Sequence, residues 1–380
     1  MTRYLVCVGT RPEIIKIAMP YRLLRARGHD VQLLHTGQHE EVAQVLYRFF
    51  EMRPDYQIEL PRRSPLLGDL TATLLERVDK VIDQVRPDVV LVQGDTTSAF
   101  TGALAAYYHD VAVAHIEAGL RTGEREPFPE EKNRELIGRL ARWHFAPTAQ
   151  AQANLLGEGI DAHRIFMVGN TVIDAALWVS ESIEQGSLDP RSSMPAVLRS
   201  FLAPYGANRL VLVTAHRREN WGQPIRDIAA SVVELLHEYP ELVVVWPVHP
   251  NPAVQQDVAQ GLSGLDARAA PRLCLTAPLD YLCMIALLAR CHFSLTDSGG
   301  IQEEASALGR PVLIARNSTE RQELVDAGGA CLVGTDRHRI VREARTLLDD
   351  EDVYRRMQLP ESPFGDGLAA ERICAILTTA

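Results

Sequence analysis

Residues 4–21 read YLVCVGTRPEIIKIAMPY, an apolar run that passes through a short turn directly into a helical pattern. Thr10 and Glu13, three residues apart, form a capping-box pattern, so a helix is predicted to start immediately after Thr10. Apolar residues then recur at helical spacing, and Gly28 is predicted to end the helix. A buried strand that leads straight into a helix is the repeating unit of a parallel α/β sheet.

The same unit recurs along the whole chain. The strand-like runs are apolar throughout and lack a period of two, as expected for strands that helices cover on both faces. The sequence therefore predicts an α/β protein with two Rossmann-like doubly wound domains. The predicted strands lie at 4–9, 31–37, 88–95, 111–117, 144–148 and 165–170, and at 210–216, 242–249, 273–278, 292–300, 311–316 and 331–335.

A break in composition separates the two halves. Residues 185–208 are rich in Gly, Pro, Ser and Asn, which is typical of a connection between domains. We therefore predict an N-terminal domain at 1–184, a linker region at 185–208 and a C-terminal domain at 209–362. The remaining residues, 363–380, are predicted to form a final helix that can pack back on the N-terminal domain.

The length, net charge and cysteine pattern of the chain argue against several classes of function. A chain of 380 residues has the length of two domains. The net charge of -10 argues against a nucleic-acid partner but allows a phosphate ligand held by local cations. Six cysteines without a C-x-x-C pair predict buried reduced thiols rather than a zinc site or disulfides. The N-terminus does not match a signal peptide, and no apolar run reaches the ~18 residues of a membrane span, so a cytoplasmic location is predicted.

Polar side chains follow many of the predicted strands. In open α/β sheets, ligands bind beyond the carboxyl ends of the strands. A single such residue is more often a helix cap or a solvated loop residue, but their recurrence over seven strand ends indicates a ligand site. These residues are Thr10 and Arg11, Gln38 and His39, Gly94 and Asp95, Glu117, His216 to Arg218, His249, and Asp297 to Gly300.

Residues 297–304, DSGGIQEE, carry the clearest phosphate-binding signal. They follow an apolar strand and open a helix that Ser298 can cap. Gly299 and Gly300 would leave backbone amides open to an oxyanion at the helix N-terminus. Glu304 could accept hydrogen bonds from two neighbouring ribose hydroxyls. The alternative interpretation is a glycine pair needed only for packing.

Carboxylates gather at the predicted strand ends of the first half. Asp95 and Glu117 each end a strand, and the motif PFPEE offers Glu130 and Glu131 where a helix begins. Such a group suggests proton transfer or a metal site. No metal-ligand spacing joins these residues and basic residues accompany them, so proton transfer is favoured and no metal is predicted. The accompanying basic residues are Arg11, Lys16, Arg121, Arg217 and Arg218, and Lys16 could equally be a solvated surface residue.

The motif TAHRREN at 214–220 places His216 at a strand end beside two arginines. A phosphate bridging this cluster would accept charge-assisted hydrogen bonds, and the histidine could protonate or stabilise a leaving group. The alternative is a histidine that only supports the ligand contacts. No P-loop, G-x-S-x-G or H-E-x-x-H motif occurs, so phosphoryl transfer from ATP, esterase chemistry and zinc hydrolysis lose support.

Seven motifs in order resemble those of the non-hydrolysing UDP-N-acetylglucosamine 2-epimerases. The resemblance implies two Rossmann-like domains facing a central cleft, the glycosyltransferase-B arrangement. It also implies interconversion of UDP-GlcNAc and UDP-ManNAc, usually by a homodimer, in pathways that commonly build surface polysaccharide. The motifs are GTRPEIIK (9–16), QGDTTSA (93–99), HIEAGLRTG (115–123), PFPEEKNR (127–134), TAHRREN (214–220), DSGGIQEE (297–304) and TER (319–321).

The resemblance also implies which residues form the site. Arg217 and His249 also follow predicted strands, so they are further candidates for substrate binding. By motif position the active-site set is Arg11, Lys16, Asp95, Glu117, Glu130 and His216, and the UDP-binding set is Ser298, Gly299, Gly300 and Glu304, with Arg321 near the phosphates.

The chemistry fits these residue types. The hydrogen on sugar carbon 2 is not next to a carbonyl, so its simple removal as a proton would be very costly. Expelling UDP from carbon 1 while that proton leaves would give a 2-acetamidoglucal, and re-addition would deliver the proton to the other face. This route needs bases and acids from the carboxylates and positive donors from Arg11, His216 and the DSGG helix. It needs no NAD and no metal, and which carboxylate serves which face stays open.

The chain departs from the family at three places, one of which is the loop TGEREPFPEE at 122–131, one residue shorter than in several relatives. At 38–44 this chain has QHEEVAQ, where many bacterial members have Q-H-R-x-M-L-D. In those members the segment belongs to a second UDP-GlcNAc site that activates the enzyme. Glu40 would repel a diphosphate, and Arg62-Arg63-Ser64 also differs from the residues of relatives. Both differences argue against such activation.

Three alternative functions stay open beside that of a UDP-GlcNAc 2-epimerase. They are a 2-epimerase of UDP-2,3-diacetamido-glucuronate, a glycosyltransferase of the same fold and a non-catalytic nucleotide-sugar sensor.

Overall fold

The computed structural model describes residues 1–38, 40–60 and 66–379, with residues 40–42 described by their backbone alone. The expectations for His39, for the Glu40 side chain and for Arg62-Arg63-Ser64 lie outside this part. The chain forms two compact units. Unit 1 contains Met1–Ala175 together with Phe364–Ala380, and unit 2 contains Ala176–Pro363.

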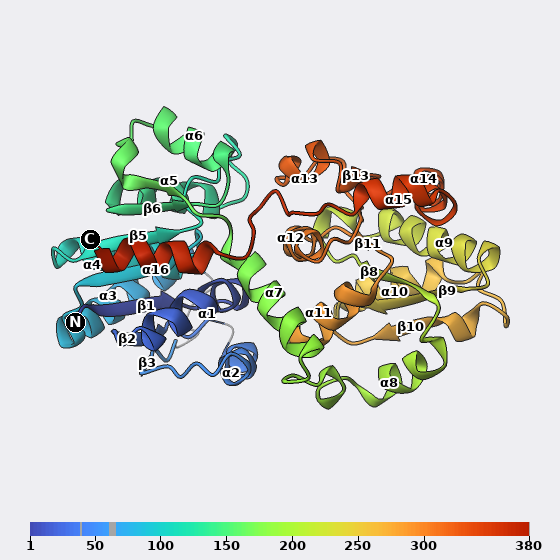
Figure 1. Cartoon of the computed structure of the whole chain (residues 1–380), viewed down its shortest axis with the longest axis horizontal. Coiled ribbons are helices and arrows are strands. Elements are labelled where there is room, and N and C mark those ends of the chain that lie inside the picture. The colour runs from blue at the N-terminus through green and yellow to red at the C-terminus, as the bar shows by residue number, and fades with distance from the viewer. Residues whose placement is uncertain (39, 61–65, 380) are drawn as a thin grey trace. The chain divides into compact units, whose positions relative to one another are not determined.

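Unit 1 is built on one parallel sheet with the strand order β3-β2-β1-β4-β5-β6-β7. Figure 1 shows the C-terminal helix α16 in red beside α1. The strands are β1 (Arg3–Val8), β2 (Asp30–His35), β3 (Tyr56–Gln57), β4 (Val89–Gln93), β5 (Ala112–Ile116), β6 (Trp143–Ala146) and β7 (Ile165–Met167). The helices are α1 (Arg11–Ala26), α2 (Glu40–Phe49), α3 (Leu67–Val85), α4 (Thr97–Tyr108), α5 (Glu130–Leu140), α6 (Ala149–Gly157), α16 (Ala369–Thr379) and the first part of α7 (Thr171–Glu184).

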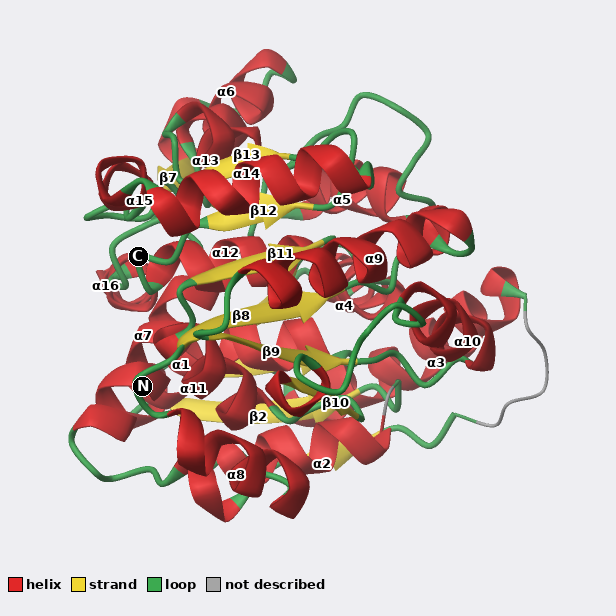
Figure 2. Ribbon diagram, turned by 90° about the vertical axis from the view of Figure 1, so that its right-hand side faces the viewer, coloured by secondary structure: helices red, strands yellow, loops and turns green. Residues whose placement is uncertain are grey.

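Unit 2 repeats this plan with the parallel order β10-β9-β8-β11-β12-β13. Figure 2 shows these strands side by side with α9 and α14 over one face. The strands are β8 (Arg209–Thr214), β9 (Leu242–Pro247), β10 (Leu273–Thr276), β11 (Phe293–Thr296), β12 (Val312–Ile314) and β13 (Ala330–Leu332). The helices are α8 (Ala196–Leu202), α9 (Gln223–Glu238), α10 (Pro252–Gly261), α11 (Tyr281–Arg290), α12 (Gly299–Ala307), α13 (Gln322–Asp326), α14 (Arg337–Asp349) and α15 (Glu351–Met357).

The predicted fold class is confirmed, since both sheets are parallel and each predicted strand overlaps an observed one. The expected capping box of α1 is also present. The sequence does not predict β3, because two residues are too few to form a recognisable apolar run. No helix in the described part is both long enough and apolar enough to cross a membrane.

The strand order of each sheet reverses in the middle, between β1 and β4 in unit 1 and between β8 and β11 in unit 2. Ligands of doubly wound sheets bind at the carboxyl ends of the strands at such a reversal. The turns that follow these four strands contain Arg11, Asp95, His216 and Ser298. The topology therefore brings the predicted site residues of each unit to the position where its sheet can bind a ligand.

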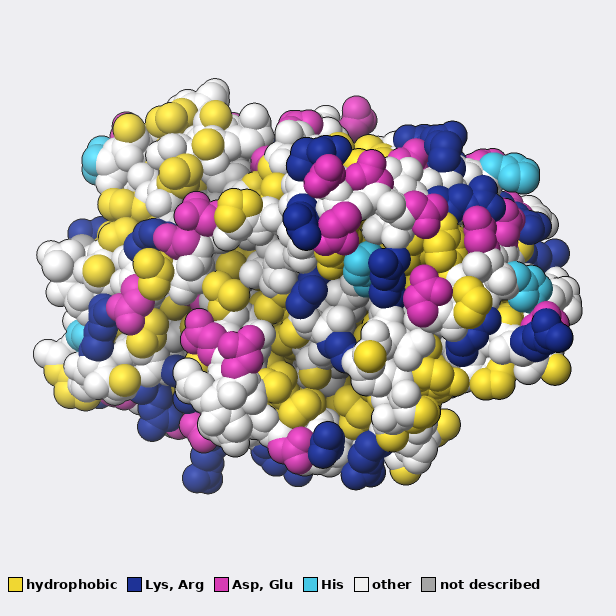
Figure 3. Space-filling model, turned by 45° about the vertical axis from the view of Figure 1, so that its right-hand side comes forward, with side chains coloured by type: hydrophobic (Ala, Val, Ile, Leu, Met, Phe, Trp, Pro, Cys, Tyr) yellow, Lys and Arg dark blue, Asp and Glu magenta, His cyan; other side chains and the backbone are white. Residues whose placement is uncertain are grey.

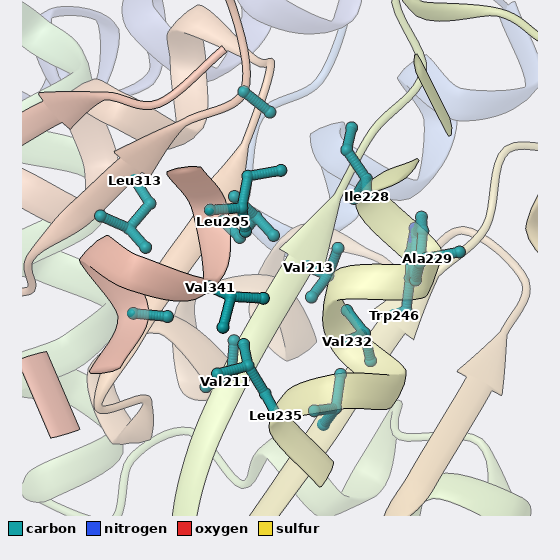
Figure 4. Packing of buried hydrophobic residues seen from close by; sticks show 14 of the residues in the cluster. Val211, Val213, Ile228, Ala229, Val232, Leu235, Trp246, Leu295, Leu313 and Val341 are labelled. Atoms are coloured by element: carbon teal, nitrogen blue, oxygen red, sulfur yellow. The ribbon is translucent and has the colours of Figure 1, made fainter. Parts of the chain in front are cut away.

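The core of unit 2 packs the sheet against α9 and α14 (Figure 4). Val213 and Trp246 come from the sheet and are fully buried, while Ile228 and Leu235 come from α9 and Val341 from α14. This apolar contact fixes β8 and β9, and with them the start of the loop that follows β8. On the face shown in Figure 3, acidic and basic side chains are interspersed rather than separated into large patches.

The division between the units falls inside α7, and not in the segment 185–208 where composition places it. That segment belongs to unit 2 and forms α8 between two short 3-10 helices, η2 (Pro190–Ser192) and η3 (Ala203–Tyr205). Its Gly and Pro residues therefore mark turns between short helices. The chain returns to unit 1 at Phe364, which lies beyond the end expected for the second domain.

The returning segment docks through backbone contacts. Asn170 N donates a hydrogen bond of 2.7 Å to the carbonyl of Phe364. Gly169 and Gly365 have φ values of +95° and +134°, and a Cβ on Gly365 would lie 3.2 Å from the Cα of Gly169. Both positions thus need glycine, for the backbone angle and for the close approach. One turn further, Asp174 Oδ1 accepts a hydrogen bond of 2.7 Å from the backbone N–H at position 370 and so anchors the start of α16.

Asp174 should make stability depend on pH. Burial raises its pKa to about 6, against the opposing effect of the backbone hydrogen bonds, whereas an unfolded Asp titrates near about 3.9. The folded state therefore favours the protonated form, and this stabilisation is fully present below the unfolded pKa and lost as the pH rises through about 6. Asp174→Asn retains the acceptor oxygen and removes the titration.

We therefore expect Asp174→Asn to become more stable relative to the wild type as the pH rises from about 4 to about 7. Urea unfolding of both proteins at about pH 5 and about pH 8 measures this difference. A stability difference that is the same at both pH values would contradict the expectation.

Candidate active site

Asp95 lies in the turn after β4 and is held by α5. Its Oδ2 accepts a hydrogen bond of 2.5 Å from Arg134, and its backbone carbonyl accepts one of 2.8 Å from Asn133 Nδ2. Burial raises the pKa of the Asp95 carboxyl, Arg134 opposes this rise, and the carboxylates of Glu117 and Glu130 add to it. The three predicted carboxylates are thus close enough to interact electrostatically, and Asp95 is suited to proton exchange.

Glu117 follows β5 in a backbone conformation that is rare for its residue type. Its φ is +67°, in the left-handed region that favours glycine. Its carboxylate accepts hydrogen bonds from Lys16 Nζ, from Gln93 Nε2 and from Asn170 Nδ2, the last at 3.2 Å. The Lys16 and Glu117 side chains are only 10% and 8% exposed, so Lys16 is not a solvated surface residue. Backbone strain of this kind persists where the surroundings impose it, and it concentrates at functional sites.

The two glutamates of the PFPEE motif have different environments. Glu131 is buried and accepts hydrogen bonds from the backbone N–H groups of Thr122 (3.0 Å) and Gly123 (3.1 Å), and it lies 3.3 Å from Arg134. Glu130 is partly exposed on the first turn of α5, and its carboxylate forms no hydrogen bond or ion pair with the described residues. Glu131 is therefore a structural carboxylate, and Glu130 is the one available to a ligand.

Arg11 opens α1, and the turn that carries it is fixed by the buried Glu13. Glu13 Oε2 accepts hydrogen bonds from the N–H groups of Gly9 (3.0 Å) and Thr10 (2.7 Å), and Oε1 accepts one from Thr96 Oγ1 (2.6 Å). Burial raises the pKa of Glu13 to about 7, against these hydrogen bonds. One carboxylate thus ties the turn after β1 to the turn after β4, on either side of the reversal in strand order.

In unit 2, the loop after β8 carries two of the predicted residues, His216 and Arg217. The Arg217 guanidinium donates a hydrogen bond of 3.0 Å from Nε to the carbonyl of Asp297. The rings of His216 and His249 are stacked with centroids 6.2 Å apart and planes inclined by 13°. The His216 side chain is 45% exposed. This loop therefore presents two imidazoles and a fixed arginine at the carboxyl end of the sheet.

The helix α12 begins at Gly299, with Ser298 at the N-cap position. The expected cap by the Ser298 side chain is not formed. The backbone N–H of Ser298 instead donates a hydrogen bond of 3.0 Å to Thr296 Oγ1. A Cβ at Gly300 would meet no atom within 4 Å. A Cβ at Gly299 would lie 3.0 Å from Arg321 Cζ, so the guanidinium lies directly against the helix start.

Two further predicted residues, Arg321 and Glu304, lie beside or within α12. Glu303 Oε1 accepts a hydrogen bond of 3.0 Å from Arg321 Nε and so holds Arg321 in place. Glu304 is buried one residue further along α12. A helix N-terminus with an open glycine and a fixed arginine is suited to binding a phosphate.

Each unit thus brings its own predicted residues together. Unit 1 brings Asp95, Glu117 and Glu130 within electrostatic reach of one another and pairs Glu117 with Lys16, which suits proton transfer, while Arg11 begins α1. Unit 2 gathers the groups that suit an anion. No group of three or more His, Cys, Asp and Glu side chains in the described part could hold a metal ion. Five residues in contact with the predicted residues or their turns belong neither to the predicted active-site set nor to the predicted UDP-binding set, although Asp297 is among the polar strand-end residues. They are Glu13, Gln93, Arg134, Asn170 and Asp297.

Comparisons with known proteins agree over the whole chain. The family model for UDP-N-acetylglucosamine 2-epimerase matches residues 22–378. The UDP-N-acetylglucosamine 2-epimerase of Yersinia pestis is 42% identical over 377 residues, which cover 99% of this chain and 98% of that protein. The crystal structure of UDP-GlcNAc 2-epimerase from Neisseria meningitidis bound to UDP-GlcNAc has a TM-score of 0.87 at 36% identity, with 100% of both chains covered. The Methanocaldococcus jannaschii enzyme in complex with UDP-GlcNAc and UDP has a TM-score of 0.78 at 32% identity, again covering 100% of both chains.

Proposed function

Because the chain belongs to the UDP-N-acetylglucosamine 2-epimerase family, we propose that it interconverts UDP-GlcNAc and UDP-ManNAc by eliminating UDP and adding it back. In the first step, a base takes the proton from sugar carbon 2, the electron pair forms the bond between carbons 1 and 2, and UDP leaves carbon 1 with the former C–O pair. The intermediate is 2-acetamidoglucal. In the second step, a proton is added to the other face of carbon 2 and UDP returns to carbon 1.

Unit 1 supplies the groups for proton transfer in this proposal. Epimerisation requires proton exchange on both faces of carbon 2, and Asp95, Glu117 and Glu130 are three interacting carboxylates in one site. The observation that carries the proposal is that Asp95 and Glu117 are held at adjacent strand ends by the cationic partners Arg134 and Lys16. A cationic partner stabilises the ionised carboxylate that must accept the proton.

Unit 2 supplies the groups for the leaving diphosphate. Negative charge develops on UDP as the C–O bond breaks, so fixed positive donors lower the barrier. Arg217, Arg321 and the N-terminus of α12 at Ser298–Gly300 are such donors, and His216 can donate a hydrogen bond to the departing oxygen. In this proposal Glu304, which is buried in α12, accepts hydrogen bonds from the ribose.

The test is proton NMR of the purified protein with UDP-GlcNAc in deuterated water, without any acceptor. We expect UDP-ManNAc to appear with deuterium at carbon 2, because the exchanged proton comes from solvent. No new sugar and no exchange would refute the proposal for this substrate. In that case UDP-2,3-diacetamido-glucuronate and a glycosyl acceptor would be tried in turn.

Gly299→Ala tests the anion site of unit 2. The added methyl group would lie 3.0 Å from Arg321 Cζ and would push the guanidinium away from the helix start. We expect the Kd for UDP to rise about tenfold, which corresponds to about 1.4 kcal/mol. Gly206→Ala is the matched control, since a Cβ there would meet no atom within 4 Å. Isothermal titration with UDP measures both, and an unchanged Kd for the Gly299 variant would contradict this role of Arg321.

A further inference from the structure

Asp297 is a fully buried carboxylate directly behind His216. It directly follows β11 and is 0% exposed. Its Oδ2 accepts three hydrogen bonds, from the N–H groups of His216 (2.9 Å) and Arg217 (2.9 Å) and from Asn220 Nδ2 (3.0 Å). Its Oδ1 accepts no hydrogen bond from the described residues, and it lies 3.4 Å from His216 Nδ1.

This distribution of donors is uneven for a buried anion. A buried carboxylate is costly unless hydrogen bonds or a cation compensate its charge. Three neutral donors serve one oxygen, and leaving the other oxygen buried without a donor is destabilising. The His216 ring is placed to remove this cost, because a proton on Nδ1 would face Oδ1 across 3.4 Å.

From this geometry we infer that Asp297 is a positioning residue for His216. It holds the loop through Oδ2 and selects, through Oδ1, the ring form that carries hydrogen on Nδ1. Nε2 is then the ring nitrogen left to meet a ligand. A carboxylate on the far side of the ring stabilises the imidazolium form, whose Nε2–H can donate to a departing oxygen. This inference rests on the proposed function, in which His216 assists the departure of UDP.

Other groups also face the His216 ring. The His249 ring stacks on it at 6.2 Å, and Arg217 is the next residue along the chain. Neither supplies a negative charge. Trp221 Nε1 donates a hydrogen bond of 3.1 Å to the His216 carbonyl and holds the backbone rather than the ring. The selection of the Nδ1–H form is therefore assigned to Asp297.

The first test does not depend on activity. Protein labelled with 15N at histidine shows by two-bond 15N–1H spectra which ring nitrogen carries hydrogen, and His216→Asn identifies the signals. We expect neutral His216 to carry hydrogen on Nδ1 in the wild type. In Asp297→Asn it should shift to Nε2–H, the form that a free imidazole prefers. A wild-type His216 with hydrogen on Nε2 would overturn the inference even if Asp297→Asn does not fold, and so would an Asp297→Asn variant without this shift.

The matched control is Asp257→Asn. Asp257 is another buried carboxylate of unit 2, and it accepts a hydrogen bond of 2.8 Å from Gly222 N near the end of the same loop. Asp257→Asn weakens this anchor of the loop but keeps the Asp297 carboxylate behind the His216 ring. We expect the His216 ring form to be unchanged in Asp257→Asn. A shift as large as that of Asp297→Asn would assign the effect to loop packing and overturn the inference.

The second test is a double-mutant cycle on turnover of UDP-GlcNAc. If Asp297 acts through His216, kcat of the double variant His216→Asn/Asp297→Asn should equal that of His216→Asn within about threefold. Losses that multiply would overturn the inference. If the wild type does not epimerise UDP-GlcNAc, the proposed function fails, and the NMR result still decides the role of Asp297.

Discussion

Asp95→Asn should reduce kcat for epimerisation by at least about a thousandfold, near the upper part of what a positioned acid or base contributes. The substitution keeps the shape of the side chain and an acceptor oxygen for Arg134, but it removes the group that exchanges the proton. The Kd for UDP should change by no more than about threefold, because Asp95 is not among the groups assigned to the diphosphate. Turnover by NMR and UDP binding by calorimetry measure the two quantities.

Asp88→Asn is the matched control for this experiment. Asp88 lies at the opposite end of the same strand, is exposed, and accepts a hydrogen bond of 2.7 Å from Arg3 N. Its substitution should leave kcat unchanged within about twofold, since it is remote from the carboxyl end of the sheet. A loss of UDP affinity as large as the loss of turnover in Asp95→Asn would show that Asp95 binds substrate instead of exchanging its proton.

Lys16→Met should destabilise the protein by about 3–5 kcal/mol, the usual cost of removing one partner of a buried ion pair. Glu117 would lose its Lys16 partner and keep the amide donors of Gln93 and Asn170, so its buried charge would lose the compensation that this lysine provides. The double variant Lys16→Met/Glu117→Gln should recover most of this stability and remain inactive. Urea unfolding provides the free energies.

The chain offers an exposed ion pair for comparison. Lys80 and Glu76 on α3 are 68% and 67% exposed at a distance of 2.6 Å. Lys80→Met should destabilise the protein far less than Lys16→Met, because exposed ion pairs contribute little to stability. If Lys16→Met is equally mild, or if the double variant is less stable than the single one, the buried pair does not hold Glu117 in the way inferred here.

The fold could be read from the sequence because its strands are buried on both faces. Such strands are continuous apolar runs, and the glycines and caps that follow them mark the turns, as at Thr10 and Gly28. The start of α12 was predictable for the same reason. The strand β3 and the boundary inside α7 were not, because neither changes the local composition.

The hydrogen-bond partners of the site residues could not be predicted from the sequence. Arg134 is 39 residues from Asp95, and Asn170 is 53 residues from Glu117, so only the strand order brings them together. Asp297 is 81 residues from the His216 N–H that it binds. The left-handed backbone of Glu117 has no signal either, because such a φ usually marks a glycine. The roles of the site residues themselves stay predictions until the variants are measured.

The path of the chain has a consequence for biosynthesis. The first unit takes its last helix from residues made after the whole of the second unit, and Tyr4 Oη donates a hydrogen bond of 3.0 Å to the carbonyl of Leu377. A nascent chain on the ribosome can therefore complete its second unit while its first still lacks α16. Until α16 arrives, the apolar surface of α1 that it covers is open to chaperones and to other nascent chains.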